Sequence, residues 1–213
     1  MAVSSRGLQS NTTYQAGGTL TAVLGKWSGR KIDSGYDEMG CFSWVRLRGK
    51  RGRKITFITA YRVSQSSGAC LGVGTFFVQK QTNMRLKVIS GTPREYVLCA
   101  LHSSIISRRS IAEDIILTMD ANEALQKTGR MREFFISTGL IDVMERHGTA
   151  PRTCLRRSSR INFIFVTPGW NHPSVRQGIL GYMIPSLPTM QAYGWNSMAL
   201  KSSKGQWIMW YKK

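Results

Sequence analysis

With 213 residues, of which 42% are hydrophobic and 19% charged, the chain can bury a core, which excludes an intrinsically disordered protein. No apolar segment is long enough to span a bilayer, and the N-terminus lacks the apolar stretch of a signal peptide. We therefore expect an intracellular protein without membrane contact, and the nucleus is one of the compartments in which it could act. The four cysteines form no CxxC pair, so neither a zinc site nor a redox dithiol is indicated.

The net charge of +19 is the compositional feature that says most about function. A chain this basic attracts polyanions, and we expect nucleic acid, DNA rather than RNA, ahead of an anionic membrane surface. Basic residues cluster at 46–54, 108–109 and 152–160, although any one cluster can be a solvated face. No acidic residue follows Glu145, so the last third of the chain cannot supply a carboxylate to a hard metal ion.

The first part of the chain predicts strands, and a β-hairpin is its clearest element. Apolar and polar residues alternate on both sides of the tight basic turn Gly49-Lys50-Arg51-Gly52. The expected elements are a loose polar leader over 1–16, a strand over 19–24, a loop over 33–40, and hairpin strands over 41–48 and 54–61.

The rest of the chain alternates predicted helices with strands. Thr92-Pro93 followed by Glu95 is typical of a helix start, and Gly139 of a helix end. Strands and connecting helices together with a hairpin favour an α/β sandwich over a parallel Rossmann sheet. The expected elements are helices over 75–87, 92–109 and 129–138, strands over 114–119, 160–166 and 175–184, a short apolar segment over 140–144, and a tail from Pro185 without clear periodicity.

Asp120 and Asn122 directly follow the apolar strand, where polar groups are held rigidly and exposed to substrate. Asp120 could orient or deprotonate a water or bind a metal, and Asn122 could donate a hydrogen bond to a phosphate oxygen. The alternative is a structural one, in which an Asx-type turn ends the strand and caps the next helix.

Polar residues also mark two other predicted strands. Tyr61-Arg62 ends one, and Asn162 lies in another behind Arg160. If these ends meet Asp120 at one edge of a sheet, they form a cleft with a base, an amide, a phenol and a guanidinium, which suits a phosphodiester. The sequence alone does not show that they meet.

Four segments, in this order and at this spacing, resemble the endonuclease/exonuclease/phosphatase superfamily, and most closely the copies associated with retroelements and reverse transcriptases. They are Gly17-Gly18-Thr19, Ile58 to Arg62, Leu117 to Glu123 and Arg160 to Ile164. The resemblance covers residues 17–186 and implies a four-layered α/β sandwich, with two mixed sheets face to face and helices outside. It also implies phosphodiester hydrolysis that depends on Mg²⁺ or Mn²⁺.

By this resemblance Asp120 positions or activates the attacking water, Asn122 contacts the scissile phosphate, and Tyr61 hydrogen-bonds at the phosphate. The metal ligands stay unknown, and so does the oligomeric state. Nucleic-acid contacts are assigned to four further residues, Arg62, Arg157, Arg160 and Asn162.

The chain departs from the family pattern in three places. The first strand of the family, with its Asn, and the next, with a metal-binding Glu, should precede Gly17, where only a short leader stands. Asn162 occupies a position at which the family has Asp. Ile184-Pro185-Ser186 enters the C-terminal Ser-Asp-His motif, but Leu187-Pro188 follow in place of Asp-His. We therefore divide the chain into a leader (1–16), a partial domain (17–186) and a divergent basic and aromatic tail (187–213).

These departures predict a degenerate member of the superfamily, derived from a mobile element, whose sandwich is incomplete at the N-terminus and whose hydrolysis is impaired. A different possibility is a basic remnant that binds nucleic acid without catalysis. A third is an unstable product in which a lost strand exposes a sheet edge and favours aggregation.

Overall fold

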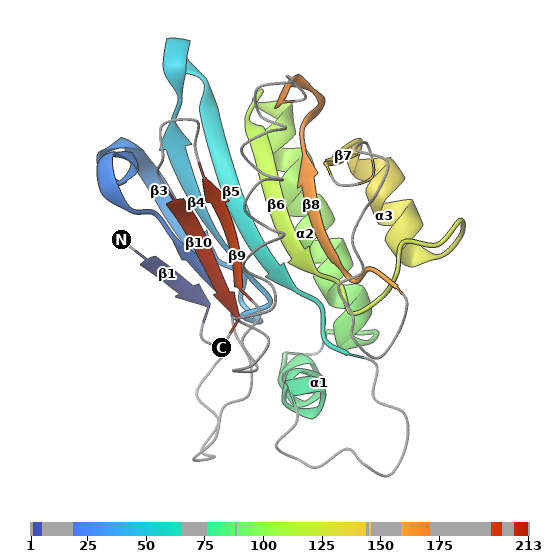
Figure 1. Cartoon of the computed structure of the whole chain (residues 1–213). Helices are drawn as coiled ribbons and strands as arrows, with labels where there is room; N and C mark the ends of the chain where they lie inside the picture. Colours follow the sequence, from blue (N-terminus) through green and yellow to red (C-terminus); the bar gives the residue numbers. More distant parts are fainter. Residues whose placement is uncertain are drawn as a thin grey trace.

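The computed structural model describes residues 2–5, 19–64, 76–87, 89–143, 145, 159–170, 197–201 and 207–212. Within these residues the chain is a mixed α/β structure, with one six-stranded and one four-stranded sheet (Figure 1). None of the described helices has the length and apolarity that a bilayer crossing needs.

The six-stranded sheet has the order β3-β4-β5-β6-β8-β7. Its central pair, β5 and β6, is parallel, and the other neighbours are antiparallel. A parallel pair needs a long crossover, and the two helices α1 and α2 lie in that connection. The strands are β3 (Lys31–Tyr36), β4 (Phe42–Arg48), β5 (Lys54–Tyr61), β6 (Asp114–Asp120), β7 (Ile141–Asp142) and β8 (Asn162–Val166).

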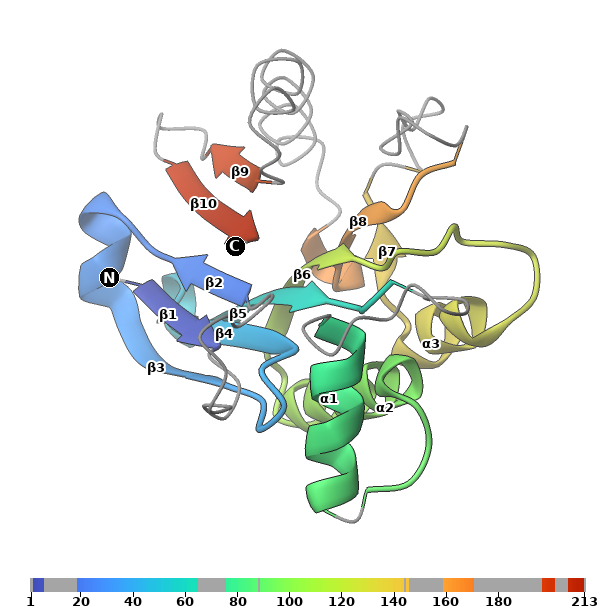
Figure 2. The ribbon, with the colours of Figure 1, turned by 90° about the horizontal axis from the view of Figure 1, so that it is seen from below.

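Three helices lie on one side of this sheet, with α1 packed on α2: α1 (Phe76–Leu86), α2 (Pro93–Ser110) and α3 (Arg130–Thr138) (Figure 2). A capping box starts α2, because Thr92 and Glu95 each bond the backbone of the other. Gly139 ends α3 with φ +59°, a left-handed conformation that glycine adopts without steric cost. Apolar side chains of α2 and α3 pack on those of the sheet and form the larger core.

The four-stranded sheet, with the order β1-β2-β10-β9, lies on the opposite face (Figure 2). Its strands β1 and β2 pack against β3, β4 and β5. Hydroxyl groups join the two sheets: Thr21 Oγ1 lies 2.9 Å from Thr59 Oγ1 and 2.9 Å from Ser43 Oγ. The strands are β1 (Ala2–Ser5), β2 (Thr19–Ala22), β9 (Ser197–Lys201) and β10 (Trp207–Lys212).

The hairpin is confirmed, because β4 pairs with β5 in antiparallel fashion across the basic turn. The three predicted helices and the strands at 19–24, 114–119 and 160–166 are confirmed as well, with shifts of a few residues at their ends. The predicted strand over 175–184 lies outside the described residues.

Three segments that were predicted to be irregular contain strands. Their composition did not indicate strands, which form because their backbones pair with other strands. Part of the loop expected over 33–40 is the edge strand β3, which contains the loop-typical residues Asp33, Ser34 and Gly35 but whose backbone pairs with β4. The leader contributes β1 and the tail contributes β9 and β10, all in one sheet with β2. Three layers are therefore described, while the outer helices that a fourth layer requires are not among the described residues.

Candidate functional site

The three predicted strand ends meet at one end of the six-stranded sheet. Tyr61 of β5 lies opposite Asp120 of β6, and Asp120 lies opposite Asn162 of β8. Thr59 lies two residues before Tyr61 and bonds Thr21 of the small sheet, so this side of β5 faces the small sheet. The Tyr61–Asp120–Asn162 row therefore sits on the face between the two sheets.

Asp120 and Asn122 form a rigid turn directly after β6. The carboxylate of Asp120, a residue that is 9% exposed, accepts a hydrogen bond of 3.2 Å from the backbone N–H of Asn122. Asn122 has φ +48°, a left-handed conformation that asparagine tolerates better than most residues. Its Nδ2 donates to the carbonyl of Arg62 at 2.7 Å, which ties the turn to the end of β5.

The Asx-type turn of the structural alternative is thus present, but it does not cap a helix. The next helix, α3, begins only at Arg130, and its N-cap, Gly129, has no side chain to bond the first turn. The turn instead holds Asp120 and Asn122 at the end of the row. Of the two hydrogens on Asn122 Nδ2, the carbonyl of Arg62 takes one.

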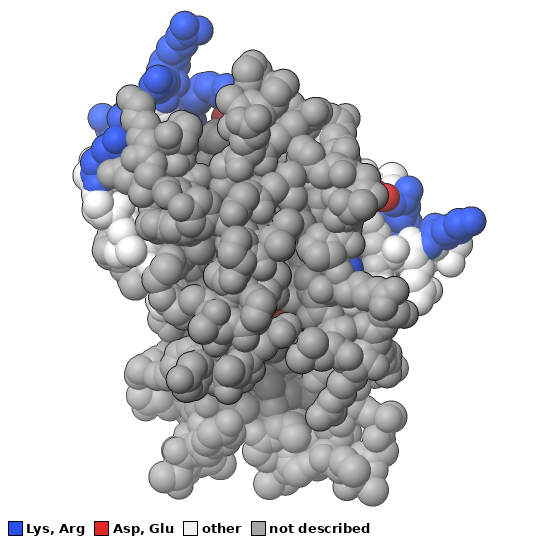
Figure 3. All heavy atoms as spheres, in the orientation of Figure 1, with Lys and Arg blue, Asp and Glu red and all other residues white. Residues whose placement is uncertain are grey.

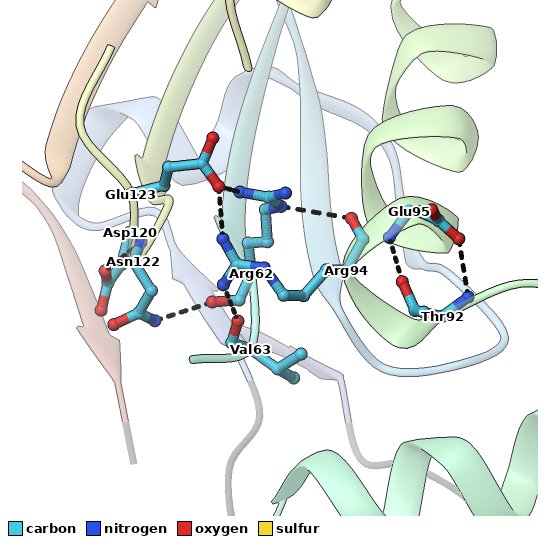
Figure 4. A network of polar contacts seen from close by, with 8 residues as sticks. All are labelled: Arg62, Val63, Thr92, Arg94, Glu95, Asp120, Asn122 and Glu123. Atoms are coloured by element: carbon cyan, nitrogen blue, oxygen red, sulfur yellow. Dashed lines mark hydrogen bonds and ion pairs between the residues drawn. The ribbon is translucent and has the colours of Figure 1, made fainter. Parts of the chain in front are cut away.

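An ion-pair network supports the row from the helix side (Figure 4). The carboxylate of Glu123 accepts hydrogen bonds from Nη1 of Arg62 and from Nη2 of Arg94, each at 2.6 Å. Arg62 Nε also donates to the carbonyl of Arg94 at 3.2 Å, and Arg94 Nη1 donates to the carbonyl of Val63 at 2.5 Å. The network therefore locks the end of β5, the turn after β6 and the start of α2 together.

The pKa shifts in this network follow from burial and pairing. Burial pushes the pKa of Glu123 upward, but the hydrogen bonds and charges of Arg62 and Arg94 outweigh it and hold that pKa below its ordinary value. Burial lowers the pKa of Arg62, against its hydrogen bond to Glu123, and the guanidinium stays protonated. Glu123 and Arg62 are therefore both charged at neutral pH.

The predicted nucleic-acid contacts lie in different surroundings. The side chain of Arg62 is 4% exposed and donates to Glu123 and to the carbonyl of Arg94, which leaves little of it accessible to nucleic acid. Arg160 forms a two-pronged ion pair with Asp142 and lies 4.6 Å from the ring centroid of Phe163, with its side chain 13% exposed. Asn162 is half-buried in the row. Arg157 lies outside the described residues.

The carboxylates of the described residues do not suffice to hold a metal ion without ligands from a substrate. All eleven Asp and Glu residues fall in the described part of the chain, and Asp120 is the only one in the row. Among the described residues, no three His, Cys, Asp or Glu side chains gather to hold a metal ion. Six of the eleven acids form ion pairs with lysine or arginine: Glu38, Glu95, Glu113, Asp114, Glu123 and Asp142.

Arg94 and Glu123 were not predicted as supporting residues. Glu123 belongs to the segment that carried the resemblance, but nothing indicated its partners, which lie 61 and 29 residues away in the chain. Arg94 was visible only as part of a helix start. An arginine at the start of a helix, where the dipole disfavours a cation, is a weak signal that it serves a tertiary contact.

Comparison with known proteins gives structural likeness only. No protein-family model and no curated protein matches the sequence. The human Nocturnin catalytic domain is similar at 12% identity and a TM-score of 0.43, over 87% of this chain and 60% of that one. The 3′ phosphatase NExo from Neisseria, solved with a product DNA hairpin, is similar at 12% identity and a TM-score of 0.41, over 85% and 70%.

An endonuclease/exonuclease/phosphatase family protein from Bacteroides thetaiotaomicron is similar at 14% identity and a TM-score of 0.33, over 85% of this chain and 64% of that one. The chain thus spans less than two thirds of the Nocturnin and Bacteroides structures. Identities and TM-scores this low do not establish the family to which the chain belongs.

Proposed function

We propose that the Tyr61–Asp120–Asn162 row is a phosphodiester site of the endonuclease/exonuclease/phosphatase type, and that the chain hydrolyses nucleic acid slowly. The observation that carries this proposal is the strand register, which brings a phenol, a carboxylate and an amide to one end of one sheet face. Asn122 lies beside these groups, because its backbone N–H donates a hydrogen bond to the carboxylate of Asp120. The order of the four family-like segments along the chain gives additional support.

Each residue of the site has a role that its chemistry allows. The Asp120 carboxylate accepts a hydrogen from a water, which orients or deprotonates it for attack on phosphorus, and a positioned base of this kind contributes roughly 100- to 10,000-fold. The phenol of Tyr61 and the amides of Asn122 and Asn162 donate hydrogen bonds to phosphate oxygens, on which negative charge builds up in the transition state. Arg62, Arg94 and Glu123 position the strand ends and do not touch the substrate.

The hydrolysis is expected to be slow because the only carboxylate of the site, Asp120, acts on the water and leaves no carboxylate for a metal ion. The family resemblance implies Mg²⁺ or Mn²⁺, and such ions need one or two carboxylates together with phosphate oxygens and waters. Apart from Asp120, the row has amide and phenol groups, and six of the other acids are held in ion pairs. The same shortage favours a second candidate function, binding of nucleic acid without cleavage, for which the net charge of +19 suffices.

A nicking assay on supercoiled plasmid separates the two functions. Wild type, Asp120→Ala and the distant control Glu133→Ala are incubated with Mg²⁺, Mn²⁺ or EDTA, and duplex binding is measured on the same samples. Slow nicking by wild type and the control, lost in Asp120→Ala, is the expected result. Salt-sensitive binding without nicking would favour the second function, whereas equal nicking by Asp120→Ala would place the chemistry elsewhere.

A further inference from the structure

A basic surface lies at the end of β5 that is remote from the row. It consists of exposed lysines and arginines of the β4–β5 hairpin and of the neighbouring turn η1 (Gly25–Arg30) with the start of β3. Figure 3 shows this group as the blue atoms at the upper left. We call it the hairpin-tip surface and define it by Lys26, Arg30, Lys31, Arg48, Lys50, Arg51 and Lys54.

The charges of the hairpin-tip surface are not neutralised by ion pairs within the described structure. The buried acids beneath it are taken by other arginines: Glu113 by Arg46 at 2.9 Å, and Asp114 by Arg53 at 2.7 Å. The exposed acid of this region is Asp33, whose carboxylate accepts from the backbone of Ser34. None of the seven basic residues takes part in an ion pair between described residues.

Strand pairing also forces like charges together at this surface. Arg48 lies directly opposite Lys54 in the antiparallel β4–β5 register. Like charges in such a cross-strand pair repel, so the arrangement costs stability in the free protein. A bound polyanion would relieve this repulsion.

The tip of the hairpin is a defined structure that carries its charges outward. The backbone N–H of Gly49 donates to the carbonyl of Arg53 at 2.7 Å, and Arg53 donates to Lys50 at 3.2 Å. Arg51 has φ +54°, a left-handed conformation in which asparagine or glycine meets a smaller penalty. An arginine therefore stands where the backbone alone would favour a small uncharged residue.

The hairpin-tip surface and the row are separate sites. They lie at opposite ends of β5, which runs from Lys54 to Tyr61. Seven strand steps of 3.3 Å place these ends roughly 23 Å apart. That distance equals about seven base pairs of duplex DNA at 3.4 Å each.

We propose that the hairpin-tip surface docks the phosphate backbone of a nucleic-acid duplex, at a distance from the row where cleavage takes place. This inference rests on the proposed function for the class of substrate, and it assigns the docking to residues outside the site. The surface carries a cluster of cations, two of which lie directly opposite each other in the hairpin. When these cations neutralise phosphates, the counterions of the nucleic acid are released, and this release provides affinity without base-specific contacts.

The test compares two double variants that remove the same charge. Lys50→Gln with Arg51→Asn alters the hairpin tip, and Arg85→Gln with Lys127→Gln alters exposed basic residues elsewhere. The affinity for a labelled duplex, longer than the span between the sites, is measured by fluorescence anisotropy over a series of salt concentrations. The tip variant should flatten the log–log salt dependence by up to about 0.9 for each lost phosphate contact, roughly 1.8 in total.

The control variant should retain the slope of the wild type. Equal slopes for the two variants would overturn the proposal, and so would a tip variant that loses binding to anionic lipid vesicles while duplex binding is unchanged. Because asparagine suits the conformation of Arg51, the melting temperature should not fall. If it does, Arg48→Gln with Lys54→Gln tests the same surface without altering the turn.

The docking surface and the proposed hydrolysis can fail independently. Glu133→Ala, which alters neither the tip nor the row, should bind duplex as tightly as the wild type. Nicking that depends on Asp120, together with no effect of the tip variant on binding, would refute the docking surface alone. Tip-dependent binding without any nicking would refute the hydrolysis alone.

Discussion

Replacing Glu123 by alanine should strongly destabilise the protein, because this carboxylate neutralises two buried guanidinium groups. The side chains of Arg62 and Arg94 are only 4% and 9% exposed. Removing one partner of a buried ion pair typically costs about 3–5 kcal/mol. Each guanidinium keeps one carbonyl acceptor, of Arg94 and of Val63 respectively, so we expect the lower end, about 3 kcal/mol.

Urea unfolding followed by circular dichroism measures this loss, and Glu133→Ala is the matched control. Glu133 is exposed on α3, and replacing such a surface residue typically changes the free energy of unfolding by less than about 0.5 kcal/mol. In a thermal melt of a chain of this size, the loss expected for Glu123→Ala corresponds to a fall of roughly 6–12 °C. If Glu123→Ala and Glu133→Ala unfolded at the same urea concentration, the supporting role of the network would be refuted.

The stabilisation by Glu123 should also depend on pH in a defined direction. Because pairing lowers the pKa of Glu123 in the folded state, its contribution is fully present above its ordinary pKa of 4.5. The contribution is lost as the pH falls through the lower, folded value. The stability difference between wild type and Glu123→Gln should therefore be large at neutral pH and shrink in acid; a difference that stays constant would contradict the assignment.

Three further predictions concern the capping box, the end of α3 and the row. Thr92→Ala removes the side-chain cap of α2 and should lower the free energy of unfolding by about 1 kcal/mol in urea titration, whereas Thr92→Ser should restore it. Gly139→Ala forces a left-handed alanine whose Cβ would lie 2.8 Å from Arg109 Nη1, and it should cost roughly 1–2 kcal/mol; no change in the melting temperature would argue against this geometry. Tyr61→Phe removes one hydrogen-bond donor from the row and should slow nicking by roughly 100-fold while duplex affinity is kept, and an unchanged rate would exclude the phenol from the reaction.

The elements that the sequence predicted well are those that local chemistry determines. The hairpin follows from alternating side chains around a basic turn, and the start of α2 from the Thr92–Glu95 pair. The strands β1, β3, β9 and β10 were missed, because their backbones pair with partners that a local pattern does not contain. The edge strand β3 in particular contains Asp, Ser and Gly, which are typical of loops.

The residues of the candidate site could be predicted from the sequence, whereas the ion-pair network that supports them could not. Polar residues at strand ends suggested Tyr61, Asp120 and Asn162, and the parallel β5–β6 pair together with the antiparallel β6–β8 pair placed them in one row. Arg62 was predicted to contact nucleic acid, as the guanidinium that follows Tyr61 at a strand end, whereas the fold buries its side chain against Glu123. Burial of a charged residue depends on its tertiary partner, which here lies 61 residues further along the chain.

The most direct test of the phosphodiester site is an NMR titration of the isotope-labelled protein with a dinucleotide, which carries a single phosphodiester. We predict that the backbone amide signals of Tyr61, Asp120, Asn122 and Asn162 shift together, and that Asp120→Ala changes or abolishes these shifts. A titration that moves signals elsewhere and leaves these four amides unchanged would contradict the placement of the site.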